Sequence, residues 1–135
     1  MTRVVLDSNI YVSALLFGGN PRLVVELAEQ SFIDVYCSPP IQKEVARVLH
    51  EKFLWSKEPT TKATNYLWSL ARCVTPRTRV NDCPDPDDNR VLECALEVRA
   101  AYIVTGDQHL LSMHPYHGIS ILTARQFLEG QFPKS

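Results

Sequence analysis

Four aspartates crowd into the start of the stretch "NDCPDPDDNRVLECAL", residues 81–96, just before an apolar segment with helical spacing. They are Asp82, Asp85, Asp87 and Asp88. Asp85 before Pro86 predicts a helix N-cap, and an acid at the position of Asp88 suits the dipole of the first turn. Capping accounts for one or two acids, but four neighbouring carboxylates repel and raise one another's pKa. The surplus indicates a use beyond starting a helix.

Three more acids fall at positions that could meet this cluster. Asp7 follows the apolar run "RVVL", and Asp107 follows "AYIVTG". Either residue could instead cap the helix that comes next. Glu44 lies roughly 60° around its predicted helix from Ile41, at the border of the apolar stripe. A solvent-facing position beside Lys43 is the alternative for Glu44.

The elements that must position these acids alternate between short β-rich runs and helical patterns. Strands are predicted at 3–6, 32–37, 73–75, 101–105 and 119–122. Helices are predicted over 9–17, from Pro21, from Ser38-Pro39-Pro40, from a cap at Thr60 or Thr61, from Asp85-Pro86, as a short turn from Asp107, and from Thr123. This alternation predicts βαβ units, and hence a three-layer α/β/α sandwich around a parallel sheet of about five strands. We expect residues 1–135 to form a single domain.

A parallel sheet places the carboxyl ends of its strands and the N-termini of the following helices at one edge. We therefore expect Asp7, Glu44, Asp88 and Asp107 to converge there. Asp87 is a possible alternative to Asp88, but the spacing of Asp88 to the apolar positions of the helix favours Asp88.

Such a pocket would offer carboxylate oxygens alone, because His109, His114 and His117 follow the turn at Asp107 and are not expected to join it. Oxygen ligands favour Mg²⁺ or Mn²⁺ over zinc or copper. The chemistry that such a site performs best is metal-assisted hydrolysis of phosphate esters.

The net charge of −1 conceals an uneven distribution. Residues 41–80 hold eight Lys or Arg against three Glu, whereas residues 81–110 hold two Arg against seven acids. A cationic face could steer a polyanion towards an acidic, metal-filled site, although ordinary helix surface is the alternative. The four cysteines show no C-x-x-C pair and are expected to be reduced and mostly packed as small apolar side chains. No apolar run is long enough for a membrane span and no signal peptide is visible, so we expect a cytoplasmic protein without a membrane partner.

With these residues in place, the sequence resembles the PIN-domain family, and in particular the VapC-type toxins of bacterial toxin–antitoxin pairs. The likeness runs along nearly the whole chain, through "VVLDSNIYVSALL", "SPPIQKEVARVL", "DPDDNRVLECA", "IVTGD" and "ISILTARQFL". It implies the sheet order 3-2-1-4-5. It also implies an acidic quartet that binds one or two Mg²⁺ or Mn²⁺ ions, with Asp7 and Asp88 as the direct ligands and Glu44 and Asp107 beside them. Asn9 and Thr105 match the family's supporting polar positions.

The resemblance further implies endonucleolytic cleavage of RNA that leaves a 5′-phosphate and a 3′-hydroxyl. A cognate antitoxin is an implied partner, and a homodimer could use the region Tyr66-Leu67-Trp68, where Trp68 in the core is the alternative. A metal-dependent phosphatase of the haloacid dehalogenase type is a weaker interpretation, because it requires a second aspartate where this chain has Asn9. A receiver domain lacks its phosphoacceptor and lysine at fitting places. A non-catalytic RNA- or protein-binding module remains the other alternative.

Overall fold

The computed structural model describes residues 1–131. Its strands are β1 (Arg3–Leu6), β2 (Asp34–Cys37), β3 (Ala71–Cys73), β4 (Tyr102–Val104) and β5 (Ser120–Leu122). Its helices are α1 (Ser8–Leu16), α2 (Gly19–Glu29), α3 (Pro39–Glu51), α4 (Lys57–Ser69), α5 (Pro86–Val98), α6 (Gln108–Leu111) and α7 (Ala124–Gln131). The predicted single domain extends to residue 135, so its last four residues lie outside the described part.

The five strands form one sheet of order β3-β2-β1-β4-β5, with every neighbouring pair parallel. The predicted fold class and strand order are therefore confirmed. Val4 and Val5 of the central strand β1 are fully buried, as expected of a strand covered on both faces. Strand order reverses between β1 and β4, and the chain leaves these two neighbours at Asp7 and at Thr105.

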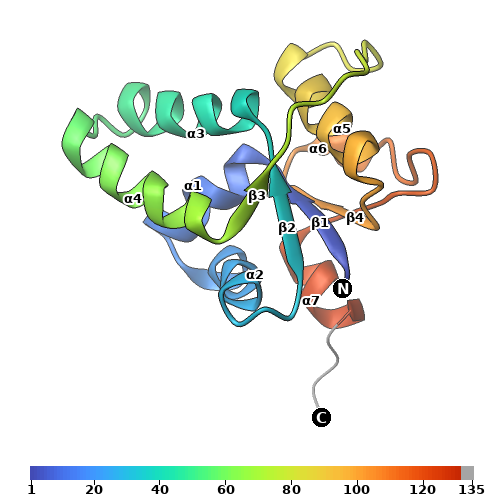
Figure 1. Cartoon of the computed structure of the whole chain (residues 1–135), viewed down its shortest axis with the longest axis horizontal. Helices are drawn as coiled ribbons and strands as arrows, with labels where there is room; N and C mark the ends of the chain where they lie inside the picture. The colour runs from blue at the N-terminus through green and yellow to red at the C-terminus, as the bar shows by residue number, and fades with distance from the viewer. Residues whose placement is uncertain (132–135) are drawn as a thin grey trace.

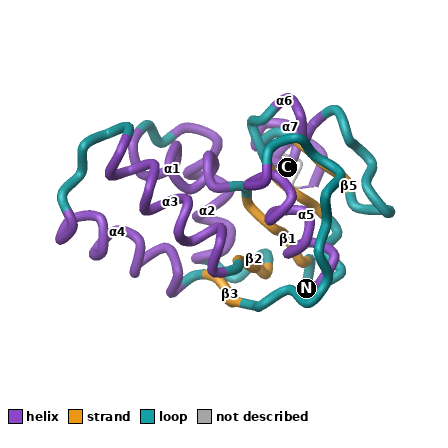
Figure 2. Tube along the Cα trace, turned by 90° about the horizontal axis from the view of Figure 1, so that it is seen from above, coloured by secondary structure: helices purple, strands orange, loops and turns teal. Residues whose placement is uncertain are grey.

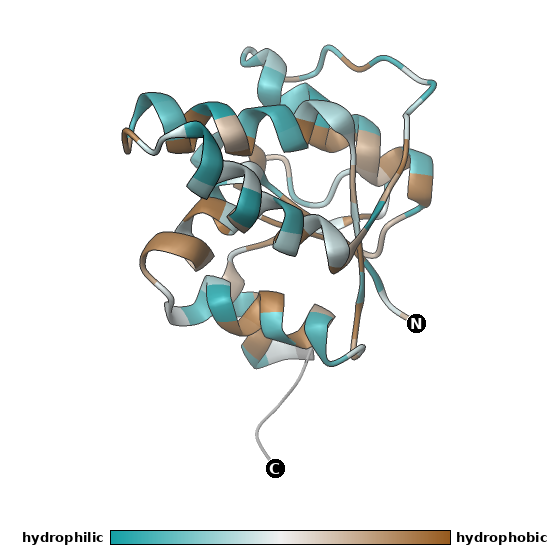
Figure 3. Ribbon diagram, turned by 60° about the vertical axis from the view of Figure 1, so that its left-hand side comes forward, coloured by the Kyte–Doolittle hydropathy of each residue, from teal (hydrophilic) through white to brown (hydrophobic). Residues whose placement is uncertain are grey.

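Helices lie on both sides of this sheet (Figures 1 and 2). Right-handed crossovers place α2 and α4, which follow β1 and β2, on one face and α5, which follows β3, on the other. Helix α5 packs against β1 and β2, and α7 packs beside α2. Apolar residues run along the strands and alternate with polar residues around the helices (Figure 3). Within residues 1–131, no helix has both the length and the apolar content needed to cross a bilayer.

The fourth helix differs most from its prediction. It begins after Ser56, so Thr60 and Thr61 lie within its first turns and do not cap it. Thr60 Oγ1 donates to the Ser56 carbonyl at 2.8 Å, which satisfies its hydroxyl inside the helix. The helix ends at Ser69, and Ala71 opens β3, where it pairs with Val35.

Other predicted boundaries move by one to three residues. Strand β3 starts and ends two residues before its predicted range of 73–75. The N–H of Phe32 bonds to the Leu27 carbonyl at 2.9 Å, so Phe32 belongs to the turn after α2 and not to β2. Helix α2 opens at Gly19, two residues before Pro21.

Side-chain burial bears on two further expectations, the possible dimer region Tyr66-Leu67-Trp68 and the packing of the cysteines. Tyr66 is 46% exposed, whereas its neighbour Leu67 is 1% exposed. Trp68 is partly buried against the core, with its ring 5.0 Å from that of Tyr11. The cysteines are free thiols as predicted, although Cys73 is exposed on the edge strand β3.

Candidate metal centre

All four predicted acids line one cleft of about 390 Å³ at the carboxyl edge of the sheet. We call it the acid cleft; Asp7, Glu44, Asp88 and Asp107 line it together with Phe17 and Phe53. Asp7 follows β1, Asp107 follows β4, and Asp88 lies in the first turn of α5. Glu44 comes from the second turn of α3. The structure thus brings together residues that stand up to 100 positions apart in the chain.

Asp7 is the most firmly held of the four. It is 6% exposed, and its Oδ1 accepts the backbone N–H of Ser8 at 2.7 Å, as an N-cap does. Its Oδ2 accepts the Thr105 hydroxyl at 2.7 Å and the Asn9 amide at 3.1 Å. Burial raises the pKa of Asp7, while the hydrogen bonds from Thr105 and Ser8 oppose that change. Asp7 therefore both caps α1 and lines the acid cleft.

Asn9 and Thr105 join the ends of the two central strands. Thr105 Oγ1 donates to Asp7 and also accepts the N–H of Asp107 at 2.9 Å. Asn9 donates to Asp7 and accepts the N–H of Gly106 at 3.3 Å. Each side chain bridges β1 to the segment after β4, which fixes the position of Asp7 relative to Asp107.

Asp88 has a buried carboxylate oxygen with no partner. The residue is 6% exposed, and among the described residues its Oδ2 finds no hydrogen-bond donor. Burial first, and then the neighbouring Asp107, Asp7 and Asp85, together raise the pKa of Asp88 to about 8. An unpaired buried carboxylate destabilises a fold unless a cation or a proton neutralises it.

The remaining acids of the "NDCPDPDD" stretch have other contacts. Asp85 caps α5 by accepting the N–H of Asp87 at 2.9 Å, as predicted. Asp82 accepts the hydroxyl of Tyr116 at 2.5 Å. Asp87 is 46% exposed at its side chain and pairs with Arg47 at 3.4 Å. Asp88 is the one buried residue of these four aspartates. Its burial agrees with the prediction of Asp88 over Asp87 as the site residue.

Glu44 lies at the edge of the acid cleft. Its side chain is 20% exposed, so it faces neither fully inward nor freely into solvent. Arg47 contacts it at 3.4 Å and also reaches Glu51 and Asp87. Burial first, and then the neighbouring Asp87 and Asp7, together raise the pKa of Glu44 to about 7, against the opposing charge of Arg47.

His109, which was expected to lie apart from the acids, lies beside Asp107. Its Nδ1 lies 3.8 Å from Oδ1 of Asp107, and that carboxylate also accepts the N–H of His109 at 3.4 Å. Ligand atoms of Asp88, Asp107 and His109 all lie within 4.8 Å of one another. Asp107 is the N-cap of α6, so the side chain two residues later folds back beside it. The D-x-H spacing at a helix start was the signal in the sequence.

Asn89 was also missed, and it positions Asp88. Its Oδ1 accepts the N–H of Cys83 at 2.8 Å, and its Nδ2 donates to the Cys83 carbonyl at 2.9 Å. This pair of bonds fastens the acidic loop onto the first turn of α5. Asn89 is 4% exposed, so it reaches the loop and not the cleft.

The donor set fits a divalent cation. Carboxylates suit Mg²⁺ and Mn²⁺, and the neighbouring imidazole adds a donor that transition ions accept more readily. Oδ2 of Asp88 has no hydrogen-bond partner, and the negative charges of Asp107 and Asp7 repel the Asp88 carboxylate. A bound cation would neutralise this buried negative charge.

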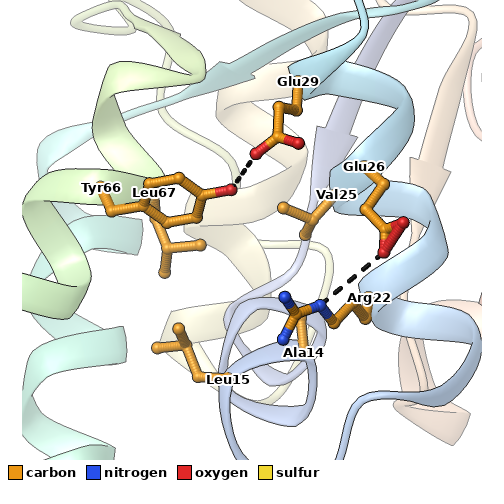
Figure 4. A pocket seen from close by; sticks show the side chains of 8 residues that line it. All are labelled: Ala14, Leu15, Arg22, Val25, Glu26, Glu29, Tyr66 and Leu67. Atoms are coloured by element: carbon orange, nitrogen blue, oxygen red, sulfur yellow. Dashed lines mark hydrogen bonds and ion pairs between the residues drawn. The ribbon is translucent and has the colours of Figure 1, made fainter.

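A second hollow, of about 300 Å³, lies between α1, α2 and α4 (Figure 4). Two of its acids have partners within it. Glu26 pairs with Arg22 at 3.7 Å, and Glu29 accepts the hydroxyl of Tyr66. Because these groups are satisfied and partly exposed to water, this α1–α2–α4 pocket lacks the features of a metal centre.

The comparisons with known proteins agree with this arrangement. Residues 3–109 match the profile of a family described as "PIN domain". This chain belongs to the PIN domain family. PIN domains are generally nucleases that use divalent metals, and the match spans all four acids and His109.

Two known proteins are similar to this PIN domain. Uncharacterized protein MJ1680 of Methanocaldococcus jannaschii is 34% identical over 116 residues, which cover 82% of this chain and 74% of that protein. The crystal structure of VapBC2 from Rickettsia felis bound to a promoter DNA fragment contains a chain that superposes with a TM-score of 0.61. That likeness covers 89% of this chain and 97% of the other at 13% identity, so it supports the fold alone.

Proposed function

We propose that this PIN domain is a divalent-metal-dependent endoribonuclease that hydrolyses RNA phosphodiester bonds. The observation that carries the proposal is the buried, unpartnered Oδ2 of Asp88 in a cleft shared with Asp7, Glu44 and Asp107. Family membership supports nuclease chemistry, and the donor set supports Mg²⁺ or Mn²⁺.

Asp7, Asp88 and Asp107 would hold the ion, with Glu44 at the edge of the cleft and His109 beside Asp107. When bound, the ion would make a water molecule more acidic and neutralise charge that develops on the phosphate. Thr105 and Asn9 hold Asp7 in one orientation, which preorganises the site. Glu44, with its raised pKa and its place at the edge, is suited to exchange a proton with solvent near neutral pH.

We further propose that the protein is the toxin component of a toxin–antitoxin pair. The similar solved structure is that of VapBC2, and we expect this chain to bind a comparable antitoxin partner. A homodimer and a cytoplasmic location stay predictions. The partly exposed ring of Tyr66 leaves α4 available for contact with another chain, whereas the packing of Trp68 against Tyr11 favours a core role for that residue.

The two alternative functions, a non-catalytic binding module and a phosphatase, predict different results with RNA. A non-catalytic binding module would bind RNA without cleaving it in any divalent ion. A phosphatase would hydrolyse a small phosphomonoester and leave RNA intact.

The test is incubation of the purified protein with defined RNAs in Mg²⁺ or Mn²⁺, with and without chelator, beside the Asp7→Asn variant. We expect metal-dependent products with 5′-phosphate ends, and no products with chelator or with Asp7→Asn. Folded protein that cuts none of the RNAs in either ion would contradict the proposal, as would equal activity of the variant.

A further inference from the structure

Two exposed phenylalanines line the same cleft as the acids. Phe17 is 73% exposed and Phe53 is 40% exposed. Their ring centroids lie 6.2 Å apart with the planes at 71°, although the two residues follow the ends of α1 and α3 and stand 36 positions apart in the chain. Large aromatic side chains gain free energy by leaving water, so an exposed pair in a cleft indicates a bound partner.

Backbone hydrogen bonds fix the main chain at Phe17 and around Phe53. Phe17 is the C-cap of α1, and its N–H donates to the Ser13 carbonyl at 2.8 Å. Phe53 lies in the turn after α3, which the N–H of Trp55 closes on the Leu49 carbonyl at 3.0 Å. A platform whose backbone is already ordered loses little conformational freedom when it binds a ligand.

A cation lies beside this platform. Lys52 precedes Phe53, lines the cleft and is exposed. Within residues 1–131 no ion pair engages it, whereas nearby Arg47 contacts three acids. Its ammonium group is therefore available to a phosphate. Ser13 and Asn9 add polar groups to the same wall.

We infer that Phe17 and Phe53 form a stacking site for an unstacked nucleobase of single-stranded RNA, with Lys52 contacting a flanking phosphate. The inference rests on the proposed function, because it places the base next to a phosphate at the acids. Aromatic side chains stack on bases that are splayed out of single strands. In a duplex both faces of each base are already stacked, so the site selects single-stranded RNA.

A protein segment could also cover an aromatic pair, but the surroundings favour RNA. The cleft continues from the two rings to the carboxylates that would hold the metal ion, and it includes an unpaired lysine. A base, its phosphate and the adjacent scissile bond match the apolar, cationic and metal-binding groups that this one cleft combines.

The experiment measures the affinity of 5′-labelled 12-mers of uridine and of adenosine by fluorescence anisotropy. A hairpin of similar length serves as the duplex probe, and all proteins carry Asp7→Asn to prevent cleavage. The variants are Phe17→Ala, Phe53→Ala and Phe53→Trp. Phe32→Ala is the matched control, since that residue is 58% exposed and lies outside the acid cleft.

We expect each alanine variant in the cleft to weaken single-strand binding by roughly 5- to 100-fold, the usual contribution of one base–aromatic stack. Phe53→Trp should retain affinity, Phe32→Ala should stay within about twofold, and the hairpin should bind weakly to every protein. In protein that retains Asp7 and cleaves RNA, the Phe17→Ala and Phe53→Ala substitutions should raise KM much more than they lower kcat.

The inference is overturned if the alanine variants bind single strands as tightly as their parent, or if the hairpin binds equally well. It is also overturned if the alanine variants change only the oligomeric state of the protein, measured by sedimentation, because the two rings would then form an interface between copies. These outcomes leave metal-dependent cleavage by the wild type intact. Stacking without any cleavage would instead sink the proposed nuclease and keep the binding site.

Discussion

The acid cleft and the α1–α2–α4 pocket both contain carboxylates, but the two regions treat them differently. In the pocket, Glu26 has Arg22 and Glu29 has Tyr66, and both acids remain in contact with water. In the cleft, Asp7 and Asp88 are nine-tenths buried, and one oxygen of Asp88 has no partner. Ion pairs at a surface contribute little to stability, whereas buried charge without a counterion is costly. The difference indicates that the cleft is built for a cation that the chain itself does not supply.

We expect the largest effect in the rate of RNA cleavage, which a substitution in the acid cleft should lower and one in the α1–α2–α4 pocket should not. Asp88→Asn removes the unpartnered charge, and we expect RNA cleavage to fall by at least about 100-fold because a metal ligand and its charge are lost. Glu29→Gln in the pocket should leave the rate within about twofold. Initial rates on one RNA substrate provide the measurement, and equal losses in both variants would erase the distinction.

A second prediction concerns pH and stability without a divalent ion. The raised pKa of Asp88, about 8, means that the folded protein holds a proton that the unfolded chain releases near pH 4. The folded state then binds more protons, so stability falls as pH rises from about 4 to 8. We expect Tm to drop by roughly 3–8 °C between pH 5 and pH 8 in chelator, through this group and Glu44.

Thermal unfolding by circular dichroism at fixed ionic strength checks this slope. Asp88→Asn cannot ionise and should flatten much of the pH dependence, while Glu29→Gln should follow the wild type. A wild-type Tm that rises over this range, or an unchanged slope in Asp88→Asn, would show that Asp88 is not held protonated.

The smallest expected effect concerns His109. If its imidazole contributes a donor beside Asp107, His109→Gln should weaken Mn²⁺ binding by about two- to fivefold and change Mg²⁺ binding less. Isothermal titration calorimetry with each ion measures both constants. His114→Gln is unsuitable as a control because Nδ1 of His114 accepts the N–H of Ile121, so the exposed His117 provides the matched variant. Identical losses for both ions would contradict a nitrogen ligand.

Much of this comparison could be predicted from the sequence, for particular reasons. Asp7 and Asp107 directly follow apolar runs, and a parallel sheet brings such positions to one edge. Asp88 follows a recognisable cap at Asp85-Pro86, so its place in the first turn of α5 could be counted. These signals are local and depend only on strand ends and helix starts.

What the sequence did not predict depends on tertiary contacts. Phe17 and Phe53 end two separate helices, and only the packing of α1 against α3 brings their rings together. His109 joins the acids because the α6 cap folds it back, which periodicity cannot show for a four-residue helix. The start of β3 was hidden because Leu70 and Ala71 continue the apolar spacing of α4.

The account depends on a cation being drawn to the acid cleft, and calorimetric titration of the RNA-free protein with Mn²⁺ at pH 7.5 tests this most directly. We expect saturable binding by the wild type and by Glu29→Gln, and at least a tenfold loss of affinity in folded Asp88→Asn. Absence of saturable binding in the wild type, or equal affinity in Asp88→Asn, would contradict the account.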